Sequence, residues 1–311
     1  MGVTERAVDA AFLELFSSEE NCAKALYHSR WPDGYRCPLC GCAEHYLIRT
    51  RRLPLFECKS CRYQASLTAG TILEGSSTPL NKWFKAIHLL TLPGGISATR
   101  LTGILEVTYK TAWLIAHKIR EAMHSADEAG KLSDFVQVMS FGYGAFHYPD
   151  SCQPVLLGAS FDGEDEIRHI KLHQPDPDHV RLPERTILKE GYRAFISNEV
   201  RSSEVSEIPF YGKANPKLSP IRHELRSWLT FTFRGIGAKH LQAYLTEFCF
   251  RSNRKLNSQE DTSFSYLLSW CASTARITYR YLTRPRRTLP VAWRTFETKS
   301  KWINMHRRSW G

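Results

Sequence analysis

Two pairs of cysteines in this chain have the spacing of a tetrahedral metal site. The first pair is Cys37 and Cys40, and seventeen residues separate it from the second pair, Cys58 and Cys61. Each Cys-x-x-Cys turn presents two thiolates, and four thiolates in this pattern bind structural Zn²⁺. We expect a zinc ribbon whose metal supplies much of its folding free energy. Cys42 competes with Cys40 as a ligand, but the regular spacing favours Cys40.

The cysteine count bears on the alternatives to zinc, which are four unrelated buried thiols or a redox pair. The chain has nine cysteines, an odd number that argues against a disulfide framework. Free thiols are typical of a reducing cytosol, so we expect a cytoplasmic protein. No apolar run approaches the length of a membrane span, and residues 1–9 do not resemble a signal peptide, so we expect no membrane partner.

Composition places the chain among globular proteins with a basic surface. It has 311 residues, enough for two or three domains, and 42% of them are hydrophobic. The formal net charge is +11. This sign of charge favours a polyanionic partner, most simply nucleic acid.

The first half of the chain has helical patterns around the cysteines. Residues 8–16 read as a short amphipathic helix, and Ser17-Ser-Glu-Glu caps a second helix that runs to about Tyr27. Residues 80–92 have apolar side chains at helical spacing, and Pro93-Gly-Gly ends this pattern.

A short helix capped by Ser97, a turn at 106–108 and a longer helix from Tyr109 to His124 then resemble a helix-turn-helix. Its second helix is expected to enter the major groove of DNA. The residues expected to point outward from this helix are Lys110, Thr111, His117, Lys118 and Arg120. An ordinary helical bundle with a solvated basic face is the alternative.

Strand patterns begin near Asp134. Four strands are expected at 135–141, 155–161, 167–172 and 185–188, with a helix after Gly191, loop-like residues at 199–220 and another helix from Ala238. Three antiparallel strands, a fourth strand and flanking helices indicate an RNase H-like α/β domain. The tail from Arg276 to Gly311 has ten Lys or Arg residues against one acid, interleaved with Trp293, Trp302 and Trp310. It either binds phosphates and stacks on bases or forms a solvated extension.

Several motifs resemble those of insertion-sequence transposases with an N-terminal zinc ribbon and an RNase H-like DDE domain. They are Arg30-Trp-Pro-Asp-Gly, Cys37-Pro-Leu-Cys-Gly, Gln64-Ala-Ser-Leu-Thr-Ala-Gly-Thr, Pro79-Leu-Asn-Lys-Trp-Phe-Lys-Ala-Ile, Tyr109-Lys-Thr-Ala-Trp, His117-Lys-Ile-Arg-Glu-Ala-Met and Tyr244-Leu-Thr-Glu-Phe-Cys-Phe-Arg-Ser-Asn-Arg-Lys. The resemblance is dense over residues 10–125 and patchy from 134 to 255. It implies a protein of the bacterial cytosol or nucleoid that binds the inverted repeats of its element as double-stranded DNA, with a homo-oligomer as a further possibility.

The expected fold class is therefore a multidomain α+β protein. Its parts are N-terminal helices (1–30), a zinc ribbon (31–72), a helix-turn-helix region (78–127), an RNase H-like mixed α/β domain (133–255) and a basic C-terminal extension (256–311).

The resemblance also implies three acids that hold two Mg²⁺ ions for strand cleavage and joining. The first would fall at Met139, whose thioether is a poor Mg²⁺ ligand, with Ser140 next to it. The other two fall at Glu190 and Glu224, so the set reads as vestigial and Mg²⁺ is expected only if catalysis is retained. Asp134 and Asp162 lie at the wrong end of the expected sheet, which leaves Asp150 as the one substitute with reasonable geometry.

Three hypotheses follow from the sequence. The chain is a transposase-like DNA-binding protein with impaired strand transfer, an active transposase with an altered metal site, or a zinc-ribbon module that binds proteins. Mg²⁺-dependent nicking distinguishes the first two, and salt-insensitive or absent DNA binding favours the third.

Overall fold

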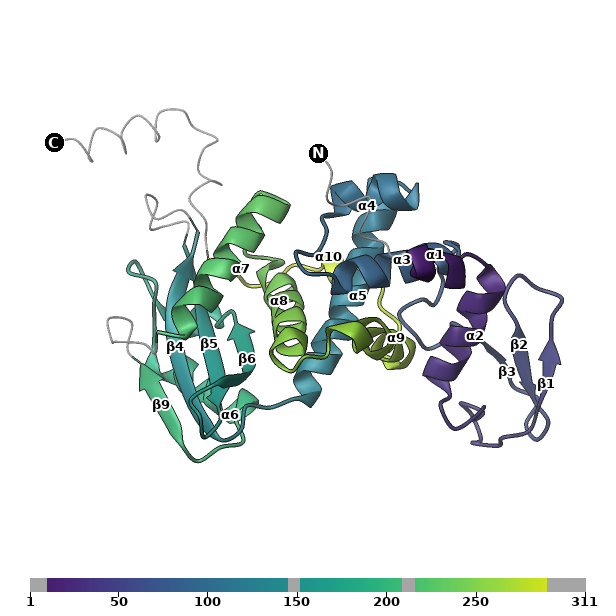
Figure 1. The fold of residues 1–311 in the computed structure, drawn as a ribbon, viewed down its shortest axis with the longest axis horizontal. Coiled ribbons are helices and arrows are strands. Elements are labelled where there is room, and N and C mark those ends of the chain that lie inside the picture. The colour runs from purple at the N-terminus through teal and green to yellow at the C-terminus, as the bar shows by residue number, and fades with distance from the viewer. Residues whose placement is uncertain (1–9, 145–151, 209–215, 290–311) are drawn as a thin grey trace. The chain divides into compact units, whose positions relative to one another are not determined.

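The computed structural model describes residues 10–144, 152–208 and 216–289. The chain forms two compact units (Figure 1). The helical–ribbon unit comprises Met1–Ala129 together with Ser258–Arg284, and the α/β unit comprises Gly130–Asn257 together with the residues from Pro285 onward.

Helix α1 spans Ala10–Leu15 and helix α2 spans Glu19–Arg30. The Ser18 hydroxyl caps α2 by accepting a hydrogen bond from the backbone N–H of Asn21. This is the cap that the Ser-Ser-Glu-Glu motif predicts, and the helix continues beyond Tyr27 to Arg30.

Strands β1 (His45–Ile48), β2 (Leu55–Cys58) and β3 (Gln64–Ser66) form an antiparallel three-stranded ribbon. Figure 1 shows α2 alongside this ribbon. The side chain of Arg30 fixes the two together, because its Nη1 donates to the carbonyl oxygens of Ser66 and Leu67 at 2.8 and 2.7 Å.

Helices α3 (Leu80–Thr91), α4 (Ala98–Leu105) and α5 (Tyr109–Ala129) follow the ribbon. The apolar face expected on α3 is buried, and the Ser97 hydroxyl caps α4 as expected. Helix α5 extends past His124 to Ala129. Of the apolar positions expected to pack inward, Trp113 is half-buried and the others are buried, namely Ala112, Ile115, Ala116 and Ile119.

The C-terminal region differs from its expected form as an extension over 256–311. Helix α9 (Ser263–Ser273) packs against α2, α3 and α5, and a short helix α10 follows at Tyr279–Thr283. Helix α9 has the high apolar content of an internal helix, and its Leu267, Leu268 and Cys271 are buried. Residues 293, 302 and 310, the three tryptophans of the tail, lie outside the described residues.

The α/β unit is built on a four-stranded sheet of order β6-β5-β4-β9. Strands β4 (Phe135–Tyr143), β5 (Gln153–Phe161) and β6 (Ile167–His173) pair antiparallel, as the sequence predicts. Strand β9 (Val205–Ile208) pairs parallel with β4. The connection from β6 to β9 includes helix α6 (Lys189–Glu199).

The short strand predicted at residues 185–188 is present, but it does not belong to the main sheet. Strand β8 (Thr186–Ile187) pairs only with β7 (Val180–Arg181), in a separate two-stranded ladder. The fourth strand of the main sheet is β9, which lies in the stretch expected to be a loop. Its four residues alternate too briefly to be recognised, and its pairing with β4 supplies the backbone hydrogen bonds that stabilise it.

Each face of the main sheet is covered by different helices (Figure 1). On one face Val136, Val138 and Leu156 pack against Tyr192 and Phe195 of α6. On the other face Met139, Phe141 and Leu157 pack against helices α7 (Leu218–Phe233) and α8 (Leu241–Leu256). The alternation of strand side chains therefore assigns Val138 and Met139 to opposite faces.

Side-chain amides of α8 cover the edge strand β6. The Asn253 amide both accepts from the N–H of Ile170 at 2.8 Å and donates to its carbonyl at 3.0 Å. Gln242 does the same for the N–H of Gln174 and the carbonyl of Leu172, at 2.7 and 3.0 Å. These bonds satisfy backbone groups that an uncovered sheet edge would leave open for association.

Candidate functional site

The four predicted cysteine ligands lie on two similar turns of the ribbon. At the first turn the N–H of Gly41 donates to the carbonyl of Cys37 at 2.9 Å, and at the second the N–H of Arg62 donates to that of Cys58 at 3.1 Å. Gly41 and Arg62 both have positive φ, +74° and +59°. Glycine adopts this conformation without strain, whereas Arg62 is held in it by the turn.

The structure brings the four sulfur atoms together. The Sγ atoms of Cys37 and Cys61 are 3.6 Å apart, those of Cys40 and Cys58 are 3.5 Å apart, and all four lie within 4.8 Å of one another. A tetrahedral Zn²⁺ with Zn–S bonds of about 2.3 Å places its sulfurs about 3.8 Å apart, so the cluster fits this ion. Cys42 is not in the cluster, because its Sγ is directed at the carbonyl of Glu44, 3.9 Å away.

The surroundings of the cysteine thiols shift their pKa values in different directions. Burial opposes ionisation of Cys37, but the backbone N–H groups of Cys40 and Leu39 and the neighbouring thiols lower its pKa to about 6. Cys61 is different: the N–H of Tyr63 favours its thiolate, yet burial and the adjacent thiols raise its pKa to about 12. A bound divalent cation stabilises all four thiolates at once, so it offsets the burial and the neighbouring thiols that oppose ionisation.

Aromatic side chains surround the cysteine turns. Phe56 of β2 stacks on Tyr27 and Tyr35 and meets Trp31 edge to face, with ring centroids 5.1–5.6 Å apart. Burial and the neighbouring thiols of the cluster raise the pKa of the Tyr35 phenol, which therefore stays protonated beside the cysteines. Together these rings form the small core that joins α2 to the ribbon.

Helices α4 and α5 are joined by a three-residue turn. Glu106 ends α4 in the left-handed conformation with φ of +49°, and the Thr108 hydroxyl accepts from the N–H of Thr111 at 3.3 Å at the start of α5. Lys110 is exposed, with its ammonium 5.1 Å from the ring centre of Tyr279, and Thr111 is half-buried. These two residues keep the surface position expected of them.

The prediction that His117, Lys118 and Arg120 point outward is wrong. Their exposed fractions are 2%, 6% and 1%. The Lys118 ammonium donates to the carbonyl of Ile72 at 2.8 Å and lies 3.4 Å from that of Glu74, so it binds the segment after the ribbon to α5. Burial lowers its pKa. Helical periodicity assigns a face to a residue but does not reveal that a long side chain bonds buried carbonyl groups.

The three positions that the resemblance implies as catalytic lie on three different elements of the α/β unit. Met139 lies in the core between the sheet and helices α7 and α8 and is 8% exposed. Glu190 is exposed in the first turn of α6, the helix that covers the opposite face. Glu224 is exposed on α7. The two carboxylates therefore belong to helices on opposite faces of the sheet.

The neighbours of Met139 are apolar as well. Across the parallel ladder it pairs with Ile208, the last residue of β9, which is also buried. The Ser140 hydroxyl, on the other face, bonds the Tyr192 hydroxyl at 2.7 Å. Residues 209–215, which follow β9, contain no carboxylate in the sequence. The sequence pattern does not single out Ile208, because β9 is too short to be recognised from it.

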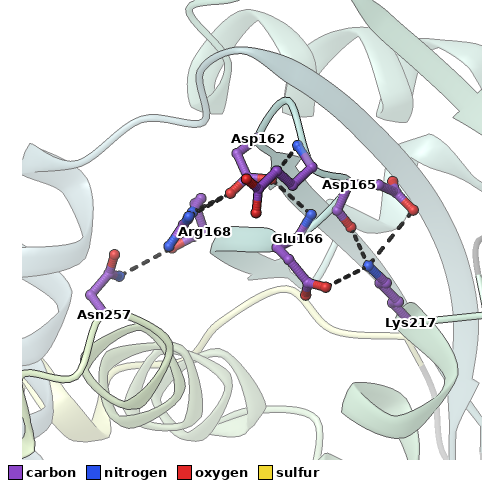
Figure 2. A network of polar contacts seen from close by, with 7 residues as sticks. Asp162, Asp165, Glu166, Arg168, Lys217 and Asn257 are labelled. Carbon is purple, nitrogen blue, oxygen red and sulfur yellow. Dashed lines mark hydrogen bonds and ion pairs between the residues drawn. The ribbon is translucent and has the colours of Figure 1, made fainter.

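The acids at the β5–β6 turn are engaged in structural contacts. Asp162 accepts from the N–H groups of Glu164 and Glu166 at 2.9 Å and forms an ion pair with Arg168 at 2.6 Å. Figure 2 shows Lys217 beside the same turn, where it bonds Glu166 at 2.9 Å and the Asp165 carbonyl at 2.6 Å. Asp134 is exposed at the start of β4, and Asp150 lies outside the described residues.

Only one cluster of metal-ligating side chains is present in the part of the chain that the structure describes, and it is the four-cysteine cluster. No three of the described acids lie close enough together to share a metal ion. No described helix combines the length and the apolar character needed to cross a bilayer.

Comparisons with known proteins agree with the cysteine site. Residues 17–64 match the model of a transposase zinc-ribbon domain. An uncharacterized protein in the transposable element ISH50 of Halobacterium salinarum is 29% identical over 114 residues, which cover 36% of this chain and 38% of that protein. No solved structure matches the chain significantly. Residues 17–64, which contain all four clustered cysteines, are thus similar to a transposase zinc-ribbon domain, and their geometry fits structural zinc.

Proposed function

We propose that this chain is a transposase-like DNA-binding protein of an insertion sequence that recognises the ends of its element without joining strands. One observation carries the proposal: a complete four-thiol cluster lies within the residues that match a transposase zinc-ribbon domain. The relative from a transposable element supports the same assignment. A closed site of four thiolates leaves no coordination position for a substrate, so the zinc has a structural role.

Charge and local architecture support DNA as the partner. The chain has a formal net charge of +11, which favours association with a polyanion. The α4–α5 pair has the short helix, three-residue turn and long helix of a helix-turn-helix, and Lys110 lies at the exposed start of its second helix. Residues at this position of a recognition helix contact base edges in the major groove.

The α/β unit supports descent from a nuclease-like enzyme. The main sheet has three antiparallel strands and a fourth strand parallel to the first, and this arrangement supports the proposal of an RNase H-like domain. In such a domain the chemistry requires acids that converge at neighbouring strand ends to hold two metal ions. Here the adjacent positions on β4 and β9 are Met139 and Ile208, so we infer that strand transfer is lost.

A binding and cleavage assay tests the proposal. Duplexes carrying the terminal repeats of the element are incubated with the full chain in Mg²⁺ or Mn²⁺, and binding is followed by fluorescence anisotropy beside a scrambled duplex. We expect salt-dependent binding that prefers the repeats, with no nicked or joined product. Nicking that is lost in Glu190→Ala or Glu224→Ala would restore the active-transposase hypothesis. Absence of DNA binding would favour a protein-binding ribbon.

A further inference from the structure

A groove of about 640 Å³ runs between helix α2 and the β1–β2 hairpin. Its cationic lining residues are Lys24 of α2 and Arg49, Arg51 and Arg52 of the hairpin loop. Tyr27 and Phe56 are the aromatic residues that line it. All of the lining residues fall within 17–64, the segment that matches a transposase zinc-ribbon domain.

Two of the four cations are engaged within the protein. Arg52 forms an ion pair with Glu19, and the Lys24 ammonium lies 2.9 Å from the carboxylate of Glu20. Arg51 forms no hydrogen bond or ion pair within the described residues. Arg49 also forms no hydrogen bond or ion pair within the described residues. The contact with Lys24 is the main cause of the lowered pKa of the Glu20 carboxyl, and the charge of Arg49 adds to it. Two exposed guanidinium groups therefore remain available to an anion at the loop.

The walls of the groove are held in place by other contacts. Glu19 accepts from the backbone N–H groups of Leu80 and Asn81 at 2.8 and 3.4 Å, which ties α2 to the start of α3. Phe56 stacks on Tyr27 with ring centroids 5.3 Å apart, which ties α2 to β2. The zinc ligand Cys58 ends the same strand. The groove is therefore formed before a ligand binds, and little ordering entropy opposes binding.

The size and charge of the groove select among polyanions. A DNA duplex is too wide to enter a space of this volume, but one sugar–phosphate strand at the surface of a duplex can lie along it. Guanidinium groups bind phosphate oxygens through two parallel hydrogen bonds, which Arg49 and Arg51 are free to form. The aromatic walls give the sugar an apolar surface on which to rest.

We propose that one phosphodiester strand of duplex DNA lies in this groove, with Arg49 and Arg51 bound to its phosphates. This inference rests on the proposed function, and it identifies the face of the ribbon that contacts DNA. The contacts are to the backbone, so they fix the register of the protein on the duplex and do not read its sequence.

The test compares two double variants of the full chain that remove the same charge. Arg49→Ala with Arg51→Ala empties the groove of its two available cations. Lys59→Ala with Arg62→Ala is the matched control, since both residues are exposed on the second cysteine turn and neither lines the groove. Zinc content and far-ultraviolet circular dichroism establish that each variant retains its fold.

We expect the groove variant to bind duplex DNA about 10- to 100-fold more weakly, and the control to lose at most a few-fold. A plot of log affinity against log salt should become shallower by about 1.8 for the groove variant, which is ~0.9 for each phosphate that the protein no longer neutralises. Equal losses in the two variants, or no loss in the groove variant, would overturn the inference. If the wild-type chain binds no DNA, the proposed function itself has failed.

Photo-cross-linking supplies a positional readout that net charge alone does not produce. A photoreactive phenylalanine analogue replaces Leu47, which lines the groove and is 42% exposed, or Leu39, which is 68% exposed on the first cysteine turn outside it. We expect cross-links to duplex DNA from position 47 and few from position 39. The reverse pattern would overturn the inference, as would displacement of the position-47 cross-link by polyglutamate as readily as by unlabelled duplex.

Discussion

Met139→Asp introduces an acid at the position where the transposase resemblance implies one, and we expect it to destabilise the protein. Met139 is 8% exposed and packs in the core between the sheet and helices α7 and α8. Its lateral neighbours on β5 and β9 are Leu157 and Ile208. The hydrophobic side chains of this cluster offer no positive charge to stabilise a carboxylate.

The size of the effect follows from two losses. Removal of a buried methionine side chain forfeits about 2 kcal/mol of hydrophobic stabilisation. Burial of a carboxyl group in apolar surroundings raises its pKa by about 2 units or more, and each unit corresponds to about 1.4 kcal/mol at neutral pH. The sum is on the order of 5 kcal/mol, which approaches the whole stability of a typical domain.

Urea denaturation followed by circular dichroism measures this loss, with Met139→Leu as the volume-conserving control that should cost under about 1.5 kcal/mol. The pH dependence separates the two losses. The folded pKa of the new aspartate lies above its unfolded value of about 3.9, so the electrostatic penalty is absent below that pH and grows as the pH rises toward the folded pKa. A Met139→Asp protein that is as stable as wild type at neutral pH, or that gains Mg²⁺-dependent nicking, would refute the core assignment of this residue.

Three further predictions concern the zinc site, helix α5 and the sheet edge. Cys58→Ser should remove most of the zinc-binding free energy, ~10 kcal/mol, and unfold the ribbon, whereas Cys42→Ser should retain full zinc content by mass spectrometry. Lys118→Ala should lower the unfolding free energy by about 1–3 kcal/mol, because the carbonyls of Ile72 and Glu74 lose their donor. Lys110→Ala should leave thermal stability unchanged and weaken DNA binding. Burial and the charge of Lys171 lower the pKa of the His169 imidazole to about 4. The stability that neutral His169 confers is therefore complete above pH ~6.5 and declines toward pH 4. His169→Phe should remove about 2–3 kcal/mol of this acid sensitivity, measured by denaturation curves at the two pH values.

Spacing-based inferences agree with the structure where the chemistry is local. The Cys-x-x-Cys turns depend on a few adjacent backbone hydrogen bonds, and the Ser18 and Ser97 caps depend on a side chain three residues from its donor. Each of these is determined within a short stretch of chain, so the pattern is sufficient. The same holds for α3, whose apolar spacing alone identifies its buried face.

The predictions that differ from the structure concern segments whose contacts are with residues distant in the sequence. Strand β9 is recognisable only through its pairing with β4. Lys118 is buried because carbonyl oxygens of the segment after the ribbon accept hydrogen bonds from its ammonium group. Helix α9 joins the N-terminal unit although more than a hundred residues of the α/β unit intervene. No periodicity within one segment encodes such contacts, because they arise from packing between segments.

The contrast between the two candidate sites has a physical basis. The cysteines are needed for the ribbon to fold, since its three short strands cannot bury a sufficient core, so any loss of a ligand is also a loss of structure. Catalytic acids have the opposite relation to folding, because clustered carboxylates repel one another and are costly to hold at strand ends without metal. An apolar residue at position 139 removes that cost and extends the core formed with Leu157 and Ile208. Under the function proposed above, loss of strand transfer therefore lets the α/β unit keep, and even gain, stability, while the ribbon persists only if all four thiols remain.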